Sequence, residues 1–451
     1  MMEKSKLKTM IACLMVLAMA SGAEASTYVE EPLEAGESWV ENGFAGEDEW
    51  SEETPLSAMV VDWQMQSIGM YKVDYHYAAK AGNVDVFRQD WPELFVVDKK
   101  TFPAEILMPG ADDFPNLSER ISNYNYGEYQ NVLHDQAKFR DVSLEEFQSS
   151  GKHFYPYVSK RDIIMRRADS LAVSFILSHY SFTGGVHGMT ELIGVNFDTE
   201  TGKRISLDEV CPDGEMLTEA IVERLREKYT QGSLNDGWEG KVAKEVIGHK
   251  ISWTLDARGV TFYFNPYDLA PYAAGILTAT ILFEEKPELF APKYLRVPAA
   301  YAEYLPMDPP ATISLRDGQG GDQDRILLYV DGKQRLHINL NDNEFIDEAQ
   351  VADVVPIHVR TRDGKNYLCV ECRNAKTNRQ QILFYALSER GIYLTGFSNN
   401  MLHYTVDEYG ENYTWQWLMT TPEELCVLNS DSEERKIHRV EMTNYGDIAF
   451  G

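Results

Sequence analysis

The chain has 451 residues, with 42 Lys and Arg against 71 Asp and Glu, which gives a formal net charge of −29. Such an acidic chain excludes wrapping of nucleic acid and electrostatic docking on anionic lipid, because both need a cationic surface. Apolar residues make up 44% and charged residues 25%, so most of the chain can build hydrophobic cores, and its length favours two or three domains.

The first 25 residues have the layout of a secretory signal peptide. Lys4, Lys6 and Lys8 precede an apolar run from residue 10 to residue 20, and Ala23-Glu-Ala25 has the A-x-A pattern of a cleavage site. The run is about half of the roughly 20 residues that cross a bilayer as a helix. We expect cleavage near Ala25, export to the periplasm or the extracellular space, and no transmembrane segment in the mature chain.

Residues 26–56 are predicted to form an acidic, disordered tether. Ten acidic residues and no Lys or Arg lie between Ser26 and Pro55. Repulsion between like charges and the backbone freedom of Gly36, Gly43 and Gly46 favour disorder. The alternative is an arm that attracts a basic protein.

Residues 57–305 mix strand and helix patterns in an irregular order, which predicts an α+β domain with a mixed or antiparallel sheet and packed helices. Apolar residues at helical spacing predict helices over 118–139 and 217–229. Alternating or β-prone runs predict a strand or hairpin over 63–77 and strands over 171–178, 193–197, 260–264 and 277–283, with a turn at 198–202.

Residues 306–451 are predicted to form a separate all-β domain, either a sandwich or a partial propeller-like array. Asp331-Gly332 and Asp363-Gly364 each lie between two β-prone runs, the pattern of a hairpin turn. Further β-prone runs are 382–386, 391–394, 401–406, 413–418 and 436–442.

Four cysteines follow the signal peptide: Cys211, Cys369, Cys372 and Cys426. Export permits disulfides, but the sequence does not choose among the three possible pairings. Cys369-Val-Glu-Cys372 has the spacing of a redox motif, yet it lies in a strand-like run, so we favour packing or a structural disulfide over redox or zinc chemistry.

The first candidate site is the turn from Tyr180 to Gly188. Three glycines in five positions indicate left-handed backbone or a close approach. Hydroxyl groups such as that of Thr183, together with His187, suit anion binding or acid–base chemistry. The alternative, which we favour from spacing alone, is a tight turn with a hydrogen-bonded histidine.

The second candidate site is a stiff loop with two Pro-Tyr pairs, Pro266-Tyr267 and Pro271-Tyr272, directly after Asn265. Tyrosine is a frequent anchor at interfaces, because it gives a large contact area for little lost entropy. The alternative is a set of core aromatic side chains capped by turns.

Several spaced motifs between residues 57 and 298 together resemble the exported domain of unknown function of RsiV-type anti-sigma factors, which also accompanies PdaC-type peptidoglycan deacetylases. The motifs follow one another in order: Arg167-Ala-Asp-Ser-Leu-Ala-Val-Ser174, Thr183-Gly-Gly-Val-His187-Gly188, Asn196-Phe-Asp198, Thr201-Gly-Lys203, Leu207-Asp-Glu209 and the loop from Phe264 to Gly275.

This resemblance implies a bacterial domain with a mixed sheet packed by helices, located outside the cytoplasmic membrane. In the anti-sigma members the domain binds lysozyme through exposed loops. The residues that the resemblance offers as a contact surface are Tyr180, Thr183, His187, Asn265, Pro266, Tyr267, Pro271 and Tyr272. This chain lacks the sigma-binding segment and any deacetylase metal motif of those relatives, and it adds the β-rich C-terminal part.

Two groups of residues in the C-terminal part are candidates for ligand binding, one for calcium and one for sugars. Asp317, Asp322 and Asp324 lie on a Gly-rich segment, which makes calcium a weak possibility beside a solvated linker, since the spacing is not that of an EF-hand. Trp415 and Trp417 are predicted to face one side of a strand, where, with Tyr413, they would stack on sugar rings or fill a core.

The sequence favours a non-enzymatic binding protein of the cell envelope, which recognises a basic protein such as lysozyme or a wall glycan, without a cofactor. The first alternative is a glycan hydrolase with His187 as acid–base, which predicts a carboxylate beside His187 within a pocket. The second alternative is a structural module of the envelope.

Overall fold

The computed structural model describes residues 60–68, 71–73, 76–77, 105–107, 111–150, 158–230, 232–307, 310–313, 315, 324–377 and 380–402, and short strands between 405 and 450. The chain divides after Pro55 into two units, and all described residues belong to the second. The predicted signal peptide and acidic tether lie outside the described residues.

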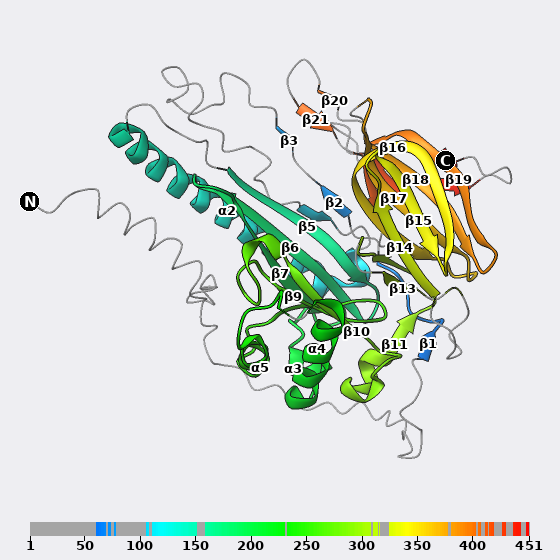
Figure 1. The fold of residues 1–451 in the computed structure, drawn as a ribbon, viewed down its shortest axis with the longest axis horizontal. Helices are drawn as coiled ribbons and strands as arrows, with labels where there is room; N and C mark the ends of the chain where they lie inside the picture. The colour runs from blue at the N-terminus through cyan, green and yellow to red at the C-terminus, as the bar shows by residue number, and fades with distance from the viewer. Residues whose placement is uncertain are drawn as a thin grey trace, which may run out of the picture. The chain divides into compact units, whose positions relative to one another are not determined.

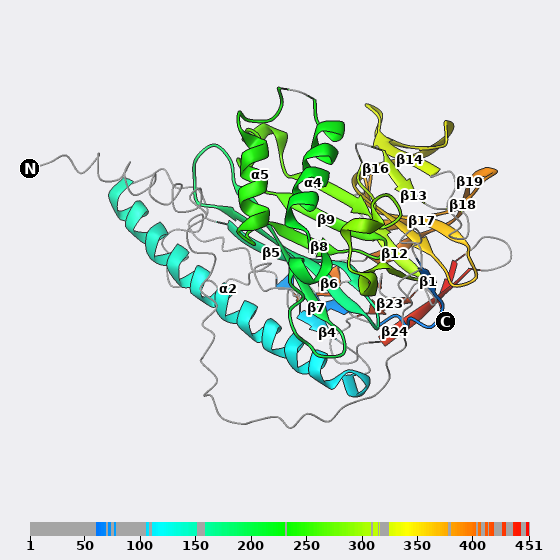
Figure 2. The same ribbon diagram turned by 90° about the horizontal axis from the view of Figure 1, so that it is seen from below.

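A long helix packs on the first sheet of the molecule (Figures 1 and 2). Three apolar side chains of this helix, Leu117, Ile121 and Tyr124, are buried with Phe175 and Phe197 of the sheet. Their spacing of three to four residues places them on one face of the helix. The elements are α2 (Pro115–Ser150), preceded by the turn η4 (Ala111–Asp113), and the antiparallel strands β5 (Val158–Ala168), β6 (Ala172–Phe182) and β7 (Met189–Asp198).

A second three-stranded sheet packs against three shorter helices. Leu217, Ile221 and Leu225 of α4 are buried in one core with Phe262 and Ile281 of the strands. Asp213 caps the N-terminus of α4 by accepting hydrogen bonds from two backbone N–H groups. The elements are α3 (Leu207–Val210), α4 (Gly214–Lys228), α5 (Trp238–Ile247), β8 (Ser252–Leu255), β9 (Gly259–Phe264) and β10 (Leu277–Leu282), in the strand order β10-β9-β8.

Side chains join the two sheets at the β7–β8 boundary. The Nδ2 atom of Asn196 donates to the Trp253 carbonyl at 3.0 Å, and its Oδ1 atom accepts from the Leu255 N–H at 2.9 Å. Gly194 lies so close to β8 that a Cβ atom built on it would be 1.8 Å from the Trp253 carbonyl oxygen. Only glycine permits this approach of the two backbones.

The C-terminal part is a large antiparallel sheet of eight strands. Seven of them pair in the order of the chain from β13 to β19, and the eighth, β12, pairs with β16. Both Asp-Gly hairpins are confirmed, because β14 pairs with β15 and β16 pairs with β17. The strands are β12 (Tyr301–Tyr304), β13 (Ala311–Ile313), β14 (Asp324–Val330), β15 (Arg335–Leu340), β16 (Asn343–Arg360), β17 (Asn366–Asn374), β18 (Gln380–Ser388) and β19 (Gly391–Leu402).

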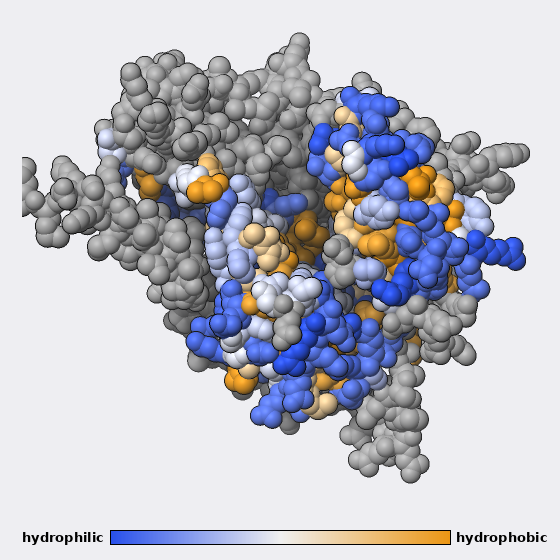
Figure 3. Space-filling model, viewed as in Figure 1, coloured by the Kyte–Doolittle hydropathy of each residue, from blue (hydrophilic) through white to orange (hydrophobic). Residues whose placement is uncertain are grey.

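The surface mixes polar and apolar side chains. On the face seen in Figure 3, hydrophilic side chains cover much of the described surface, and hydrophobic ones gather in smaller groups. Ile346 and Tyr393 are among the exposed apolar side chains of the eight-stranded sheet. Within the described part of the chain, no helix is both long and apolar enough to cross a membrane.

Three of the remaining strands, β1, β2 and β3, pair with strands that are distant in the sequence. The strand or hairpin predicted over 63–77 is wrong as a hairpin: β1 pairs in parallel with β11, β2 pairs with β4, and β3 pairs with β21. Local alternation gives the strand character of this stretch but not its distant partners. These strands are β1 (Val60–Asp62), β2 (Tyr71–Val73), β3 (His76–Tyr77), β4 (Glu105–Leu107), β11 (Arg296–Pro298), β20 (Thr405–Val406), β21 (Glu411–Tyr413), β22 (Trp415–Leu418), β23 (Cys426–Asn429), β24 (Lys436–Met442) and β25 (Ile448–Phe450).

The structure thus confirms the α+β class with several antiparallel sheets and packed helices. The predicted helices 118–139 and 217–229 correspond to α2 and α4. Helix α5 and strands β5 and β8 were not predicted. The predicted run 401–406 is divided between β19 and β20.

Candidate functional site

The first candidate loop is the connection between β6 and β7. Gly184 and Gly185 have φ angles of 88° and 98°, so the predicted left-handed backbone is present. Gly188 is buried under Tyr180, because a Cβ atom built on it would lie 2.4 Å from the Tyr180 ring. The turn therefore needs glycine both for its backbone conformation and for a close contact.

The second candidate loop connects β9 to β10 and includes the turn η5 (Tyr272–Ala274). The Asn265 N–H donates to the Asp268 carboxylate at 2.7 Å, and Tyr267 between them has a φ angle of 74°. Such a φ is uncommon for a residue other than glycine, and it is a source of local strain. The Tyr267 side chain lies at the surface, with 51% of the residue exposed.

The structure brings the two loops together. The ring of His187 stacks on Tyr272, with centroids 3.5 Å apart and planes inclined by 14°. The Tyr267 hydroxyl lies 3.3 Å from His187 Nε2, and the Tyr272 hydroxyl donates to the Gly188 carbonyl at 2.8 Å. We call His187, Tyr267 and Tyr272 the aromatic cluster.

The hydrogen bonds of His187 fit one neutral tautomer. Its Nδ1 atom lies 3.0 Å from the Gly188 carbonyl oxygen, a distance suited to an N–H donor. With the proton on Nδ1, the Nε2 atom accepts from the Tyr267 hydroxyl. Both ring nitrogens of His187 therefore have a hydrogen-bond partner, although the residue is exposed.

The other predicted contact residues divide into supporting and surface positions. Asn265 has a supporting role: its Oδ1 atom accepts from the Leu192 N–H at 2.8 Å, and its Nδ2 atom lies 3.5 Å from the Leu192 carbonyl oxygen. Pro266 is buried, which also makes it a supporting residue. Pro271 is exposed, and Tyr180 and Thr183 are half-buried.

The described contacts of His187 do not include the carboxylate that the hydrolase alternative predicts. Its polar contacts within the described chain are a tyrosine hydroxyl and a backbone carbonyl, and neither is a carboxylate. A histidine that shuttles protons is usually oriented by a carboxylate partner. The arrangement suits contact through the exposed rings of His187 and Tyr267, with Tyr272 half-buried beside them.

A charged group lies between α2 and the first sheet, and the sequence did not point to it. Arg161 of β5 bonds to Glu128 at 2.6 Å and to Asp135 at 2.7 Å, both on α2. Burial and the positive charge of Arg161 lower the pKa of the neighbouring His179 to about 4. The group ties the helix to the sheet through paired charges.

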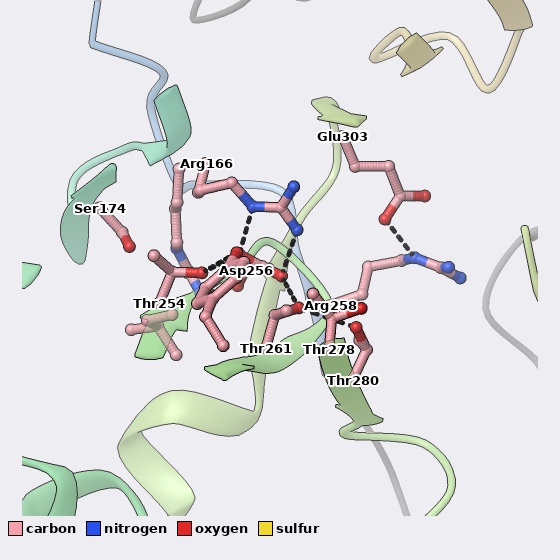
Figure 4. Close-up of polar contacts among 12 residues, drawn as sticks. Arg166, Ser174, Thr254, Asp256, Arg258, Thr261, Thr278, Thr280 and Glu303 are labelled. Atoms are coloured by element: carbon pink, nitrogen blue, oxygen red, sulfur yellow. Dashed lines mark hydrogen bonds and ion pairs between the residues drawn. The ribbon is translucent and has the colours of Figure 1, made fainter. Parts of the chain in front are cut away.

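A buried polar network joins β5, β8, β9 and β10 (Figure 4). Arg166 donates to both carboxylate oxygens of Asp256, at 2.9 and 2.6 Å. The hydroxyl groups of Thr254 and Thr261 also donate to this carboxylate, and Thr261 contacts Thr280 at 2.9 Å. Burial alone would lower the pKa of Arg166, but the charge of Asp256 outweighs this effect and raises it.

A second buried network links the α+β part to the eight-stranded sheet. Arg258, which follows β8, donates to Glu303 of β12 at 3.3 Å and to the Thr312 carbonyl at 2.8 Å. Glu303 lies 2.9 Å from His358 Nδ1, and His358 Nε2 lies 3.0 Å from Asn366 Oδ1. Burial alone would raise the pKa of Glu303, but Arg258 and the hydrogen bond to His358 lower it to about 2.

The weak calcium hypothesis concerns three aspartates, of which only Asp324 is described. Its Oδ2 atom accepts from the Leu315 N–H at 3.1 Å, and its Oδ1 atom accepts from Asn341 at 2.5 Å. Both oxygens therefore hold protein groups in place. Asp317 and Asp322 lie outside the described residues, and no group of three or more His, Cys, Asp or Glu placed to hold a metal occurs among those described.

Three of the four cysteines that the sequence singled out lie at buried positions. Cys211 is a buried free thiol, and Cys369 is another in strand β17. Burial raises the pKa of both thiols, which opposes thiolate chemistry. Cys372 is buried in the same strand. The side chains of Cys426, Tyr413, Trp415 and Trp417 lie outside the described set.

One segment of this chain is similar to a known protein family. Residues 212–284 match the sequence model of the family described as "Protein of unknown function (DUF3298)". This segment runs from the start of α4 to just past β10, so it contains Tyr267 and Tyr272 of the aromatic cluster. A search of curated proteins found no match.

Two solved structures are similar to the chain. A DUF3298 family member from Bacteroides fragilis is 17% identical, and the alignment covers 50% of this chain and 94% of that chain with a TM-score of 0.33. A DUF3298 family protein from Pseudomonas aeruginosa is 16% identical, and the alignment covers 53% of this chain and 98% of that chain with a TM-score of 0.27.

Proposed function

We propose that this chain, which contains a DUF3298 segment of unknown function, is an exported binding protein of the bacterial cell envelope. Its aromatic cluster is the contact surface, and its partner is a basic protein such as lysozyme or a glycan of the cell wall. The signal peptide pattern and the resemblance to the exported domain of RsiV-type proteins support this location and this partner class.

The observation that carries the proposal is the convergence of two loops at the surface, where His187 and Tyr267 are exposed and Tyr272 is half-buried. His187 comes from the β6–β7 loop, whereas Tyr267 and Tyr272 come from the β9–β10 loop. Tyrosine rings fixed in this way lose little conformational freedom on binding, and their hydroxyl groups give direction to the contact. The same rings stack on sugar faces or on cationic side chains.

Charge gives the protein partner a further advantage. The net charge of −29 accelerates encounter with a basic partner and opposes encounter with an acidic one. The hydrolase alternative has less support, because His187 contacts no carboxylate in the described part of the chain.

The test is binding of the full chain to hen lysozyme and to soluble peptidoglycan fragments, measured by calorimetry at low and high salt. Tyr267→Ala and Tyr272→Ala are compared with Tyr393→Ala, because Tyr393 and Tyr267 have similar exposed fractions of 52% and 51%. We expect each cluster variant to weaken binding by about 2 kcal/mol, as at interface anchors, and the control to match the wild type.

Three results would count against the proposal. The first is absence of binding to either probe at low salt. The second is equal weakening by all three alanine variants. The third is binding to lysozyme that disappears on addition of salt for wild type and variants alike, which would indicate charge attraction without a specific surface.

A further inference from the structure

An open groove of about 550 Å³ lies where the end of α5 meets the start of α4. Helix α3, the segment that links it to α4, the first turn of α4 and the last residues of α5 form its walls. None of the three residues of the aromatic cluster lines this groove.

The groove combines a buried apolar floor with an exposed apolar edge. Leu207, Leu217 and Val246 line it and belong to the core of the α+β part. Ile247, the last residue of α5, also lines it and is 65% exposed. An exposed isoleucine beside buried apolar residues offers an apolar contact to an aliphatic side chain of a partner.

The polar part of the groove is acidic. Three carboxylate side chains line it, those of Asp208, Asp213 and Glu215, together with His249, which lies 3.5 Å from Asp208. Neither Lys nor Arg is among the described residues that line it. The groove therefore favours a cation at its rim.

The ends of the two helices that line the groove strengthen its preference for a cation. The start of α4 would attract an anion, but Asp213 already accepts hydrogen bonds from the Glu215 and Met216 N–H groups at 3.0 Å, and Glu215 adds a second negative charge. The C-terminus of α5 carries the negative end of its helix dipole. Both ends thus favour positive charge.

We infer that this groove is a second interaction surface, which binds a segment of a partner protein that carries an aliphatic side chain next to Lys or Arg. The acidic N-terminal segment of the chain itself has the wrong charge, since residues 26–55 hold ten acids and no Lys or Arg. A second copy of this acidic chain is disfavoured for the same reason.

The test uses three labelled dodecapeptides and fluorescence anisotropy with the full chain. One peptide alternates Leu with Lys, one alternates Leu with Glu, and one alternates Ser with Lys. We expect saturable binding of the Leu/Lys peptide only, with binding of the Ser/Lys peptide at least about tenfold weaker because it lacks the aliphatic contact.

Matched variants locate the site. Ile247→Ser is compared with Ile346→Ser, which removes an exposed isoleucine from β16. One double variant, Asp208→Asn/Glu215→Gln, removes two charges from the groove. Its control is the double variant Glu200→Gln/Glu288→Gln, which removes the same charge from exposed positions outside the groove. We expect the groove variants to bind about tenfold more weakly and the controls to bind as the wild type does.

The inference is overturned if the Leu/Lys peptide does not bind, or if it binds groove variants and controls alike. It is also overturned if the Ser/Lys peptide binds as tightly as the Leu/Lys peptide. Concentration-dependent self-association that Ile247→Ser abolishes would assign the groove to a second copy instead. The proposed function is tested with other probes, lysozyme and peptidoglycan fragments, and with other variants, Tyr267→Ala and Tyr272→Ala, so the two proposals are tested separately.

Discussion

The imidazole of His187 lies flat on the ring of Tyr272, and the Tyr272 hydroxyl donates to the carbonyl of the residue that follows His187. One tyrosine therefore holds both the side chain and the backbone of the neighbouring loop. This pair makes a single surface from two loops that are far apart in the sequence.

Tyr272→Phe is expected to lower the free energy of unfolding by about 1 kcal/mol, because it removes one hydrogen bond and keeps the stacked ring. Tyr272→Ala is expected to cost about 1 kcal/mol more, since the ring contact is lost as well. Urea denaturation measures both. Tyr393→Phe is the control, and a Tyr272→Phe protein as stable as the wild type would contradict the role of the hydroxyl.

Gly194→Ala is expected to destabilise the protein by about 3 kcal/mol, because its Cβ atom would collide with the Trp253 carbonyl and separate β7 from β8. Gly127→Ala is the matched change in α2, where nothing lies within 4 Å of the new atom. It should stabilise the helix by about 1 kcal/mol. In thermal and urea denaturation, the change in unfolding free energy should therefore have opposite signs for the two variants. Changes of the same sign would contradict the close approach of Gly194 to Trp253.

Asp256→Asn is expected to lower the free energy of unfolding by about 3–5 kcal/mol, because Arg166 would keep its buried charge without a partner. The comparison is Asp353→Asn, which breaks the ion pair with Arg373 at a side chain that is 66% exposed. That pair should contribute less than about 1 kcal/mol. If urea denaturation shows similar losses of unfolding free energy for the two variants, burial of the ion pair does not determine how much its loss destabilises the protein.

Glu303 should make the free energy of unfolding depend on pH in the acidic range. Its pKa is lowered to about 2 in the folded protein against 4.5 in the unfolded chain, so its contribution is complete above pH 4.5 and is lost as the pH falls toward 2. The shift corresponds to about 3 kcal/mol. The difference in unfolding free energy between wild type and Glu303→Gln should shrink by that amount between pH 6 and pH 2.

Denaturation of both proteins across this pH range provides the measurement for Glu303. Glu288→Gln, at an exposed position, serves as the control and should follow the wild-type curve. A constant difference between wild type and Glu303→Gln would show that the carboxylate of Glu303 is not stabilised by Arg258 and His358.

Local patterns were sufficient for many elements. Helix α4 was predicted because Leu217, Ile221 and Leu225 recur at helical spacing, and the structure buries all three. Helix α5 was missed although Trp238, Val242 and Val246 have the same spacing between two glycines. A window search for period 3.6 would have found it.

Long-range partners were beyond the sequence. Both loops of the candidate site were singled out for their glycines and Pro-Tyr pairs, but the sequence does not show that they meet. The contacts that join them link residues about 80 positions apart, as Tyr267 and Tyr272 contact His187. The buried networks were missed for a related reason. The burial of Arg166 and Arg258 cannot be read from the sequence, because the carboxylates that pair with them, Asp256 and Glu303, lie 90 and 45 residues further along the chain.

The hydrogen bonding of Asn265 to Leu192 also affects the entropy of binding. Ordering a loop residue costs roughly 1–2 kcal/mol when it occurs on association. Here the loop that carries Tyr267 is fastened to strand β7 by two contacts to one residue, so this cost is met when the chain folds. A partner that docks on the tyrosines then keeps more of its contact energy as affinity.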